Sequence, residues 1–342
     1  MVNEQIKIPW VSFCMTTYKR SLFLKEQLEI ILKQNFQDFE VVICDNDPEC
    51  SARIVVSSIG DSRLKYLPNH ENLGMIKSFN KSIEHSISKY IVMITDDDPI
   101  YPDMLDTMVA LESKYPGYGM YLGGCDLFCT HHDIANLYGL KIGTNSCLSN
   151  NHNLNYVKTF EPYEFVKDIF SAKIFSHYLW STGMVKREIL VQMGGVPDYG
   201  TPFLGDYAYL SIMGSHSGCI VINKSLGCQT IHAENFGRNQ NEQLAIVVKN
   251  FPEYLTQKLS GIPQWNDIEK LMKRFVAIWV SGHMAFLHHL KDMQKDENKE
   301  SLKTAELLIF KNDFMKKYRL KYFLKKNLPL IHDLAVKLKK RY

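Results

Sequence analysis

The cysteines show no pattern that points to a structural metal or to a disulfide framework. None of the eight forms a CxxC pair, and the pair Cys125 and Cys129 has no His or Cys partners downstream at zinc spacing. A chain of 342 residues can bury a core large enough to fold without such links. We therefore expect reduced thiols, as in a cytoplasmic protein.

Long apolar runs are missing as well. The longest, residues 275–287, is interrupted by Ser281, Gly282 and His283 and is too short to cross a bilayer. Residues 1–8 are polar and lack the apolar core of a signal peptide. With 45% hydrophobic and 23% charged residues, the composition is that of a globular protein, which we expect in the cytoplasm.

Positive charge is concentrated at the C-terminal end. Residues 311–342 hold eleven Lys or Arg and two Asp, a net +9, whereas the whole chain carries only +3. Aromatic residues such as Phe314, Tyr322 and Phe323 alternate with these bases. The combination suits an anionic membrane surface, here the inner face of the cytoplasmic membrane. A solvated helical face is the alternative, and we do not expect nucleic acid as a partner.

The first half of the sequence alternates strand and helix patterns. Apolar runs at 11–15, 39–44, 64–67 and 90–94 predict strands. Between and after them, apolar residues at helical spacing predict helices, one capped by Ser21, one with Ile76 to Ile87 on its inner face, and one opened by Pro102. This alternation indicates an α/β fold with a doubly wound, mostly parallel sheet, Rossmann-like in architecture.

The second half is less regular. Residues 125–163 are rich in His, Asn and Gly with weak periodicity, which predicts irregular structure and a flap over an active site. Beyond residue 262 the pattern is helical, with one element over 265–290. We place a boundary near residue 240, between a catalytic domain (1–240) and a helical, basic C-terminal region (241–342).

Polar side chains follow three of the predicted strands. They are Thr16-Thr17-Tyr18, Asp45-Asn46-Asp47 and Asp96-Asp97-Asp98. Ligands of open α/β sheets bind beyond the carboxyl ends of the strands, so these groups should meet at one crevice. Three adjacent carboxylates repel one another, and a divalent cation relieves that cost. The alternative is a solvated acidic turn.

The order and spacing of these motifs resemble those of family 2 glycosyltransferases with the GT-A fold. The resemblance covers roughly residues 8–240. The matching stretches are VSFCMTTYKR (11–20), QNFQDFEVVICDND (34–47), NHENLGMIKSFNKSI (69–83), YIVMITDDDPIYPDML (90–105), GG (194–195), LGDYAYL (204–210) and IHAEN (231–235).

The resemblance implies a nucleotide-sugar donor site. Thr16 and Tyr18 would flank the base, and Asp45 would accept a hydrogen bond from its N3–H group, which favours UDP- or dTDP-sugars. Arg20 and Lys77 would contact the diphosphate. There are alternatives without a role in binding: Tyr18 could pack on the first helix, and Lys77 could be a surface charge.

The resemblance also implies a metal site for Mn²⁺ or Mg²⁺. Asp96 would hold the ribose and Asp97 would bind the metal. Asp98 would share the metal or face the acceptor. His232, at the end of an apolar run, would complete the site and would favour Mn²⁺, although a lone His is often structural. Family members often carry an acid where this chain has Thr95, which leaves the roles of the three aspartates open.

Transfer with inversion needs one base, and we assign Asp206, which could also be a helix N-cap. His177 and Trp180 are candidates for the acceptor site, with core packing as the alternative. The resemblance thus predicts an inverting glycosyltransferase acting on a glycan or lipid-linked acceptor, in bacterial surface-polysaccharide synthesis. A sugar-nucleotide pyrophosphorylase is less suitable, because no glycine-rich loop follows the first strand. A non-catalytic sugar-nucleotide or glycan-binding module is the second alternative.

Overall fold

The structure is a computed structural model, and it describes residues 8–173, 176–232, 235, 241–293 and 300–328. One mixed sheet runs through the molecule, with strand order β3-β2-β1-β4-β8-β5-β9-β7 and β6 paired to β5. The strands are β1 (Val11–Thr17), β2 (Phe39–Asp45), β3 (Leu64–Pro68), β4 (Tyr90–Ile94), β5 (Met120–Cys129), β6 (Gly143–Asn145), β7 (Val157–Phe160), β8 (Gly183–Lys186) and β9 (Cys219–Ile231).

Strands β1 to β4 pair in parallel, as does β5 with β9, whereas β8 lies antiparallel between β4 and β5. The helices between strands are α1 (Ser21–Leu32), α2 (Arg53–Ile59), α3 (Met75–His85), α4 (Met104–Lys114), α5 (His132–Tyr138), α6 (Pro162–Ser171), α7 (Arg187–Gln192) and α8 (Gly205–Ser217). The doubly wound α/β fold predicted from the sequence is confirmed.

Alternate residues of the central strands point to opposite faces of the sheet. Phe13 and Met15 of β1 join one core with α1, α2 and α4, while Cys14 joins the other core with α3, α6 and α8. Strands buried on both faces read as continuous apolar runs, which is why 39–44 and 90–94 were recognisable. Every residue of β2 and β4 is buried.

Three local predictions were wrong. Ser21 is the first residue of α1 and does not cap it; its hydroxyl donates to the Ser51 carbonyl. The helix after Pro102 begins at Met104. Most of 125–163 is regular structure, because the end of β5 pairs with β9, and α5, β6 and β7 follow.

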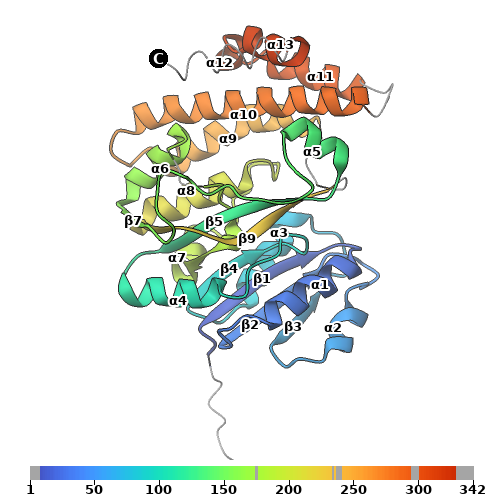
Figure 1. Cartoon of the computed structure of the whole chain (residues 1–342), viewed down its shortest axis with the longest axis vertical. Coiled ribbons are helices and arrows are strands. Elements are labelled where there is room, and N and C mark those ends of the chain that lie inside the picture. The colour runs from blue at the N-terminus through green and yellow to red at the C-terminus, as the bar shows by residue number, and fades with distance from the viewer. Residues whose placement is uncertain (1–7, 174–175, 233–234, 236–240, 294–299, 329–342) are drawn as a thin grey trace, which may run out of the picture.

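The C-terminal helices are layered over one side of the sheet domain. They are α9 (Gln243–Leu259), α10 (Trp265–Met293), α11 (Glu300–Ile309), α12 (Asp313–Lys316) and α13 (Arg319–Asn327). Figure 1 shows α10 spanning the width of the molecule between α9 and α11. Their apolar faces share one core cluster with α6 and α8. Within the described residues, none of the helices combines the length and apolarity needed to cross a bilayer.

Candidate active site

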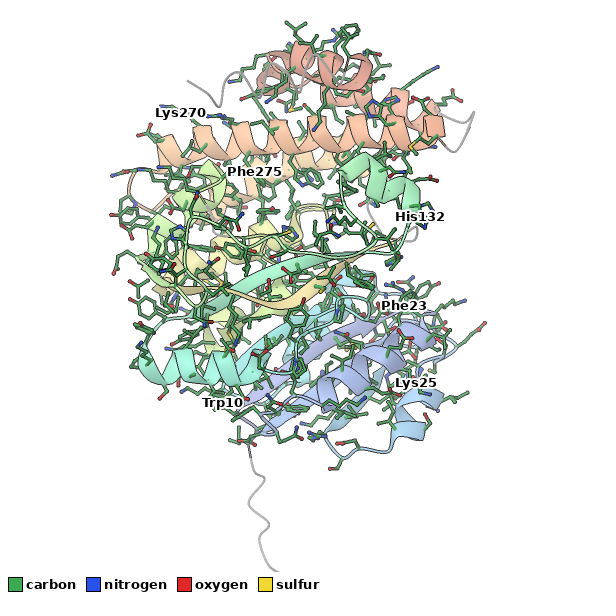
Figure 2. The ribbon with its side chains drawn as sticks, in the orientation of Figure 1. Trp10, Phe23, Lys25, His132, Lys270 and Phe275 are labelled. Carbon is green, nitrogen blue, oxygen red and sulfur yellow. The ribbon has the colours of Figure 1, made fainter. Side chains whose placement is uncertain are left out.

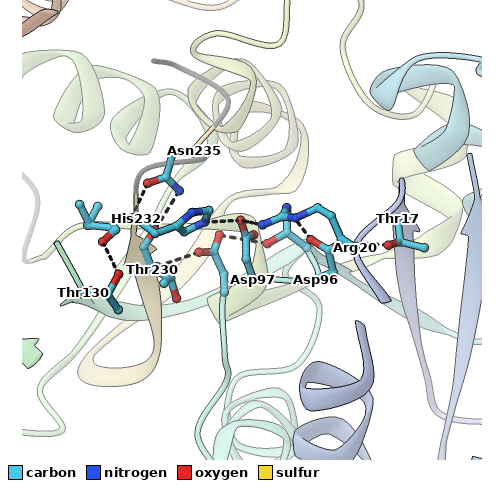
Figure 3. Close-up of polar contacts among 11 residues, drawn as sticks. Thr17, Arg20, Asp96, Asp97, Thr130, Thr230, His232 and Asn235 are labelled. Atoms are coloured by element: carbon cyan, nitrogen blue, oxygen red, sulfur yellow. Dashed lines mark hydrogen bonds and ion pairs between the residues drawn. The ribbon is translucent and has the colours of Figure 1, made fainter. Parts of the chain in front are cut away.

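Asp96, Asp97 and Asp98 follow β4 after a single residue, Thr95, so the sheet holds them at its carboxyl edge. Arg20, at the start of α1, bridges the first two: its guanidinium lies 2.7 Å from Asp96 Oδ1 and 2.8 Å from Asp97 Oδ2 (Figure 3). The Thr17 hydroxyl donates to the other oxygen of Asp96 at 2.8 Å. The ends of β1 and β4 therefore form one hydrogen-bonded unit.

Asp97 also contacts His232, which follows β9. The imidazole Nε2 lies 3.1 Å from Asp97 Oδ2. Burial raises the pKa of Asp97, but the hydrogen bond to His232 and the charge of Arg20 outweigh burial and lower the pKa to about 2. Asp97 is thus a charged carboxylate that lies between the Arg20 guanidinium and the His232 imidazole.

The other two aspartates are disfavoured as anions. Burial raises the pKa of Asp96 to about 6, with Arg20 opposing the rise. Burial, and then the charge of Asp97, raise the pKa of Asp98 well above its usual range. The two oxygens of Asp98 accept hydrogen bonds from the Thr95 hydroxyl at 3.0 Å and the Thr230 backbone N–H at 2.9 Å. Asp98 therefore ties the end of β4 to the end of β9.

His232 is held from several sides. Its backbone N–H donates to Asn235 Oδ1 at 2.8 Å, and the Asn235 amide donates to the Thr230 carbonyl at 3.0 Å. The Phe23 ring stacks on the imidazole with centroids 5.5 Å apart and lies under the Arg20 guanidinium. These contacts fix the ring with Nε2 directed at Asp97, as Figure 3 shows.

A cavity of about 530 Å³ opens beside this unit. Asp97 and Asp98 line it from β4, and Asp206 lines it from the first turn of α8. Burial raises the pKa of Asp206 to about 7. Leu204, the actual N-cap, has φ of 60°, a conformation that a residue other than glycine rarely adopts. Asp206 is the second residue of α8 and therefore not its N-cap, and it lines the cavity.

His177 and Trp180 also line the cavity. His177 Nε2 lies 2.9 Å from the Gln229 side-chain oxygen, and burial lowers the pKa of His177. The Trp180 ring packs between Phe79 and Tyr209 in edge-on geometry. Trp180 thus belongs to the core and to the cavity wall together.

The remaining predicted donor residues lie at the same sheet edge, outside the cavity lining. Asp45 is fully buried and accepts from the backbone N–H groups of Asp47 and Ala52 and from the Tyr66 hydroxyl, which leaves little free acceptor capacity. Thr16 donates to Ser78 at 2.6 Å. Tyr18 is 43% exposed, and Lys77 is exposed on α3.

The sequence interpretation missed a group of aromatic side chains that line the cavity. Tyr138 of α5 and Trp279, His283 and Phe286 of α10 line the cavity from regions assigned to a flap and to a separate helical region. The spacing 279, 283, 286 is a helical stripe and was available in the sequence. Thr17 and Asn235 stood in the quoted motifs without an assigned role, because their hydrogen bonds to Asp96 and to the Thr230 carbonyl depend on the fold.

The residues present fit a divalent cation. A carboxylate oxygen of Asp97 and the imidazole nitrogen of His232 converge, and that oxygen already holds the positive charge of Arg20. Among the described residues, no three His, Cys, Asp or Glu side chains form a complete metal cage. Mg²⁺ and Mn²⁺ bound with nucleotides commonly have two ligands from the protein, and diphosphate oxygens supply further ligands.

Residues 12–129 match the family described as glycosyl transferase family 2. A glucosyltransferase from Escherichia coli that is named for UDP-Glc and α-D-GlcNAc-diphosphoundecaprenol is 25% identical over 104 residues, 30% of this chain and 41% of the relative. A β-1,3-glucosyltransferase from Campylobacter jejuni, named for a diphosphate-linked undecaprenol glycan, is 24% identical over 34% of this chain and 38% of its own length. The chain thus spans about two fifths of these relatives.

Solved structures match over nearly the whole chain. S. aureus TarS residues 1–349 has a TM-score of 0.56 at 14% identity, covering 91% of this chain and 92% of TarS 1–349. The mannosyltransferase PcManGT of Pyrobaculum calidifontis has a TM-score of 0.52 at 15% identity, covering 95% and 88%. At this identity the likeness shows the fold, and the matched segment shows the family. Residues 12–129 therefore form a glycosyl transferase family 2 domain, and the chain has the GT-A fold.

Proposed function

We propose that this protein transfers a sugar, with inversion and with the help of Mn²⁺ or Mg²⁺, from a UDP- or dTDP-sugar to a hydroxyl of a glycan or lipid-linked acceptor. The observation that carries the proposal is the shared cavity, into which Asp97 and Asp206 project from elements far apart in the sequence. A charged carboxylate and a carboxyl whose pKa lies near neutral pH, both lining one cavity, suit donor binding and base catalysis respectively.

The donor would lie along the carboxyl edge of β1, β2 and β4. Thr16, Tyr18 and Asp45 are assigned to the base, Asp96 to the ribose, and Arg20 and Lys77 to the diphosphate. The contact of Arg20 with Asp96 and Asp97 supports its role, because a guanidinium at this place can exchange a carboxylate partner for a phosphate. TarS, a structural neighbour, has been solved with UDP-GlcNAc.

Asp97 and His232 would hold the divalent cation, with Asp98 as a third ligand or as the brace between β4 and β9. A bound cation supplies charge stabilisation for the departing nucleoside diphosphate. The neighbour PcManGT was solved with GDP-Man and Mn²⁺, which supports this assignment.

Asp206 would act as the base. An acceptor hydroxyl attacks the anomeric carbon, its proton passes to the Asp206 carboxylate, and the bond from that carbon to the diphosphate oxygen breaks. One displacement inverts the anomeric centre and releases the nucleoside diphosphate, so no second nucleophilic carboxylate is needed. Asp206 lines the same cavity as Asp97 but comes from α8, which supports this division of roles.

A donor-release assay tests the activity. Purified protein with Mn²⁺ and a panel of nucleotide sugars should release UDP or dTDP slowly without acceptor and faster with one. Exchange of pyrophosphate into the donor would instead indicate a pyrophosphorylase. Donor binding with neither reaction would indicate a binding module, and either result would overturn the proposal.

Two substitutions separate the roles. Asp97→Ala should abolish the Mn²⁺-dependent part of donor binding, whereas Asp106→Ala, at an exposed position of α4, should not. Asp206→Asn should bind donor normally and lose transfer by about 10²-fold or more. The matched control is Asp198→Asn, which removes an exposed carboxylate on the loop before α8. Near-normal transfer by Asp206→Asn would show that the base lies elsewhere.

The C-terminal helices offer a docking face for a membrane that carries a lipid-linked acceptor. Leu320 and Phe323 of α13 are 69% and 54% exposed and stand among the bases Arg319, Lys321 and Lys325. Basic residues with exposed apolar side chains favour an anionic bilayer surface. The final part of the basic segment, 329–342, lies outside the described residues.

A further inference from the structure

We infer that α11 and α13 form a pocket that binds the headgroup phosphate of an anionic phospholipid and thereby anchors the protein to one leaflet of a membrane. The residues that line this pocket are all different from those that line the cavity with Asp97 and Asp206. It is therefore a site apart from the donor and the acceptor. The inference rests on the membrane contact of the proposed function and names the group that this contact recognises.

The pocket has a volume of about 480 Å³ and lies in the outermost helical layer. Figure 1 shows α11 and α13 on the side of α10 that is opposite to the sheet. Lys303, Glu306 and Leu307 line the pocket from α11, and their spacing of three and four residues places them on one helix face. Arg319 and Lys326, seven residues apart, line it from α13. Two helix faces thus enclose one space.

Positive charge is concentrated around this space. Four bases and one acid line it, a net charge of +3. Lys303, Lys311 and Arg319 form no ion pair with any residue that the structure describes, whereas Lys326 pairs with Glu306 at 2.9 Å. Unpaired cations around one space repel one another, and a bound anion relieves that cost. The charge of the pocket therefore predicts an anionic ligand.

The single acid of the pocket does not oppose a bound anion. Glu306 Oε2 accepts hydrogen bonds from Lys326 Nζ at 2.9 Å and from the Tyr322 hydroxyl at 2.8 Å. His288 Nε2 of α10 lies 3.3 Å from the same oxygen. The charge of Glu306 is thus offset inside the contacts that join α10, α11 and α13. The other three bases set the sign of the potential in the pocket.

The bases are mounted on a packed frame. Phe310, which follows α11, lines the pocket, and its ring lies 5.0 Å from that of Tyr322 in α13. Tyr322 is 2% exposed and shares a core cluster with Met315 and with residues of α10. The two walls are therefore held together by a buried contact. A preformed pocket binds one anion with little ordering cost, whereas a flexible basic segment responds to charge alone.

Exposed apolar side chains beside the pocket favour a phosphate that is attached to a lipid. Leu307 lines the pocket and is 64% exposed. Phe323 is 54% exposed and stands four residues after Arg319 and three before Lys326, so it lies on the same side of α13. A soluble phosphate ester would leave these side chains in water. The interface of a bilayer covers them while its phosphates reach the bases.

The chemistry of the bases indicates which headgroups bind. The Arg319 guanidinium can donate two parallel hydrogen bonds to phosphate oxygens, and Lys303 and Lys311 add compact charges. The ammonium group of phosphatidylcholine offsets the charge of its own phosphate and is repelled by these bases. We therefore expect phosphatidylglycerol to bind and phosphatidylcholine to bind weakly.

The test compares vesicles of equal surface potential, using the full chain. Phosphatidylcholine vesicles receive either phosphatidylglycerol or oleate, in amounts that give the same zeta potential, and cosedimentation at increasing lipid concentration gives each affinity. Phosphatidylglycerol vesicles should bind about fivefold more tightly, because the oleate carboxylate lies too close to the acyl chains to enter a pocket. Inorganic phosphate and sn-glycerol 3-phosphate, titrated without vesicles, show how much of the affinity belongs to a free phosphate.

Two double variants remove the same charge from different places. Lys303→Gln with Arg319→Gln empties the pocket of two bases and should abolish the preference for phosphatidylglycerol over oleate. Lys317→Gln with Lys321→Gln removes two exposed bases outside the pocket, so it should weaken binding to both vesicles alike and keep the preference.

Single variants complete the set. Arg319→Lys keeps the charge and should retain binding with part of the preference lost. Lys25→Gln removes a base of α1 at the opposite end of the molecule (Figure 2) and should bind as the wild type does. Melting temperatures within a few degrees of wild type show that each variant is folded.

Several results would overturn the inference while leaving the membrane contact intact. They are equal affinity of the wild type for the two kinds of vesicle, or an unchanged preference in Lys303→Gln with Arg319→Gln. Tight binding of free phosphate by a chain that binds no vesicles would assign the pocket to a soluble phosphate ester. A wild type that binds neither vesicles nor phosphate would count against the membrane contact itself. Release of UDP from the donor, assayed without vesicles, tests the glycosyltransferase separately.

Discussion

Asp206 illustrates how a single residue depends on its surroundings. Burial raises the pKa of this carboxyl to about 7, and a base acts only when deprotonated. We therefore predict that kcat/KM falls about tenfold per pH unit below pH 7 and levels off above it. Because the folded pKa is raised, the charged form that is needed for transfer is scarce in acid.

The measurement is a pH profile of transfer, with donor affinity determined at each pH so that loss of metal or donor is not mistaken for loss of the base. A profile with its midpoint near pH 4 would mean that Asp206 titrates like an exposed carboxyl. A flat donor affinity across the range would assign the acid limb to catalysis.

Arg20 competes with a cation for the same carboxylate oxygen. It holds Asp97 Oδ2 at 2.8 Å, the oxygen that also faces His232. We predict that Arg20→Met binds Mn²⁺ alone more tightly, by about threefold to tenfold, because the competing charge is gone. The same variant should bind UDP-sugar more weakly, because a diphosphate contact is lost.

The predicted change in Mn²⁺ affinity is measured by titrating the nucleotide-free protein with Mn²⁺. Electron paramagnetic resonance gives the concentration of free ion at each point. The control is Arg63→Met, which removes an arginine paired with Asp61 away from the site. Weaker Mn²⁺ binding by Arg20→Met would show that the guanidinium supports the metal site instead of competing with it.

At this scale the sequence could place the acidic residues but not their partners. The sequence placed Asp45, Asp97 and His232 at one edge of the sheet, because each follows or ends a predicted strand and the carboxyl ends of parallel strands lie at the same edge. Asp45 accepts hydrogen bonds from the Ala52 N–H and the Tyr66 hydroxyl. These contacts depend on the path of the loop after β2 and on the position of β3, and the periodicity of the sequence does not predict either.

Among the elements, the turn that follows α7 depends on one glycine. Gly195 has φ of 79°, and a Cβ there would lie 2.2 Å from Asn80 Oδ1, which accepts the Val196 N–H at 2.7 Å. We predict that Gly195→Ala lowers stability by about 2–3 kcal/mol, from backbone strain plus the displaced Asn80 contact. Thermal and urea unfolding measure the loss.

Gly194 provides the matched control. Its φ of 94° is equally unfavourable for alanine, but nothing lies within 4 Å of a Cβ at that position. Gly194→Ala should therefore show the strain alone, about 1 kcal/mol. Equal losses in the two variants would mean that the Asn80 contact contributes nothing.

Elements that pair late in the chain were the hardest to predict. The end of β5 follows two glycines and meets β9 with two register shifts, so its alternation is broken although the strand continues. The long helix over 265–290 was predicted correctly, because its repeat persists over seven turns or more. What the stripe of Trp279, His283 and Phe286 faces could not be predicted, since Tyr138 of α5 lies 141 residues before Trp279 in the sequence.

Across the whole molecule, the predicted boundary near residue 240 falls where the chain passes from β9 to α9. Phe203 contacts Trp279 and His283 across it, and one core cluster includes residues from both sides. The C-terminal region therefore supplies walls of the cavity as well as a candidate membrane face. A truncation that removes α12 and α13 would strip Met315 and Tyr322 from that core.

Substitutions are therefore the better test of membrane docking. We predict that the full chain floats with vesicles containing about 30% anionic lipid and much less with neutral vesicles, because bases near the surface add roughly 1 kcal/mol each. Leu320→Ser with Phe323→Ser should reduce flotation severalfold. Leu22→Ser with Ile54→Ser, which removes even more exposed apolar groups from α1 and α2, should not.

Salt and length separate the contributions of charge and of the final residues. Flotation that depends on the bases should fall steeply as ionic strength rises, since screening shortens the reach of surface charge. A chain ending at residue 328 keeps every described helix and lacks four Lys or Arg. Should the Leu320/Phe323 double variant float as well as the wild type while the shortened chain does not, the contact belongs to residues 329–342 and α13 faces water; equal flotation on neutral vesicles would rule out an electrostatic membrane contact.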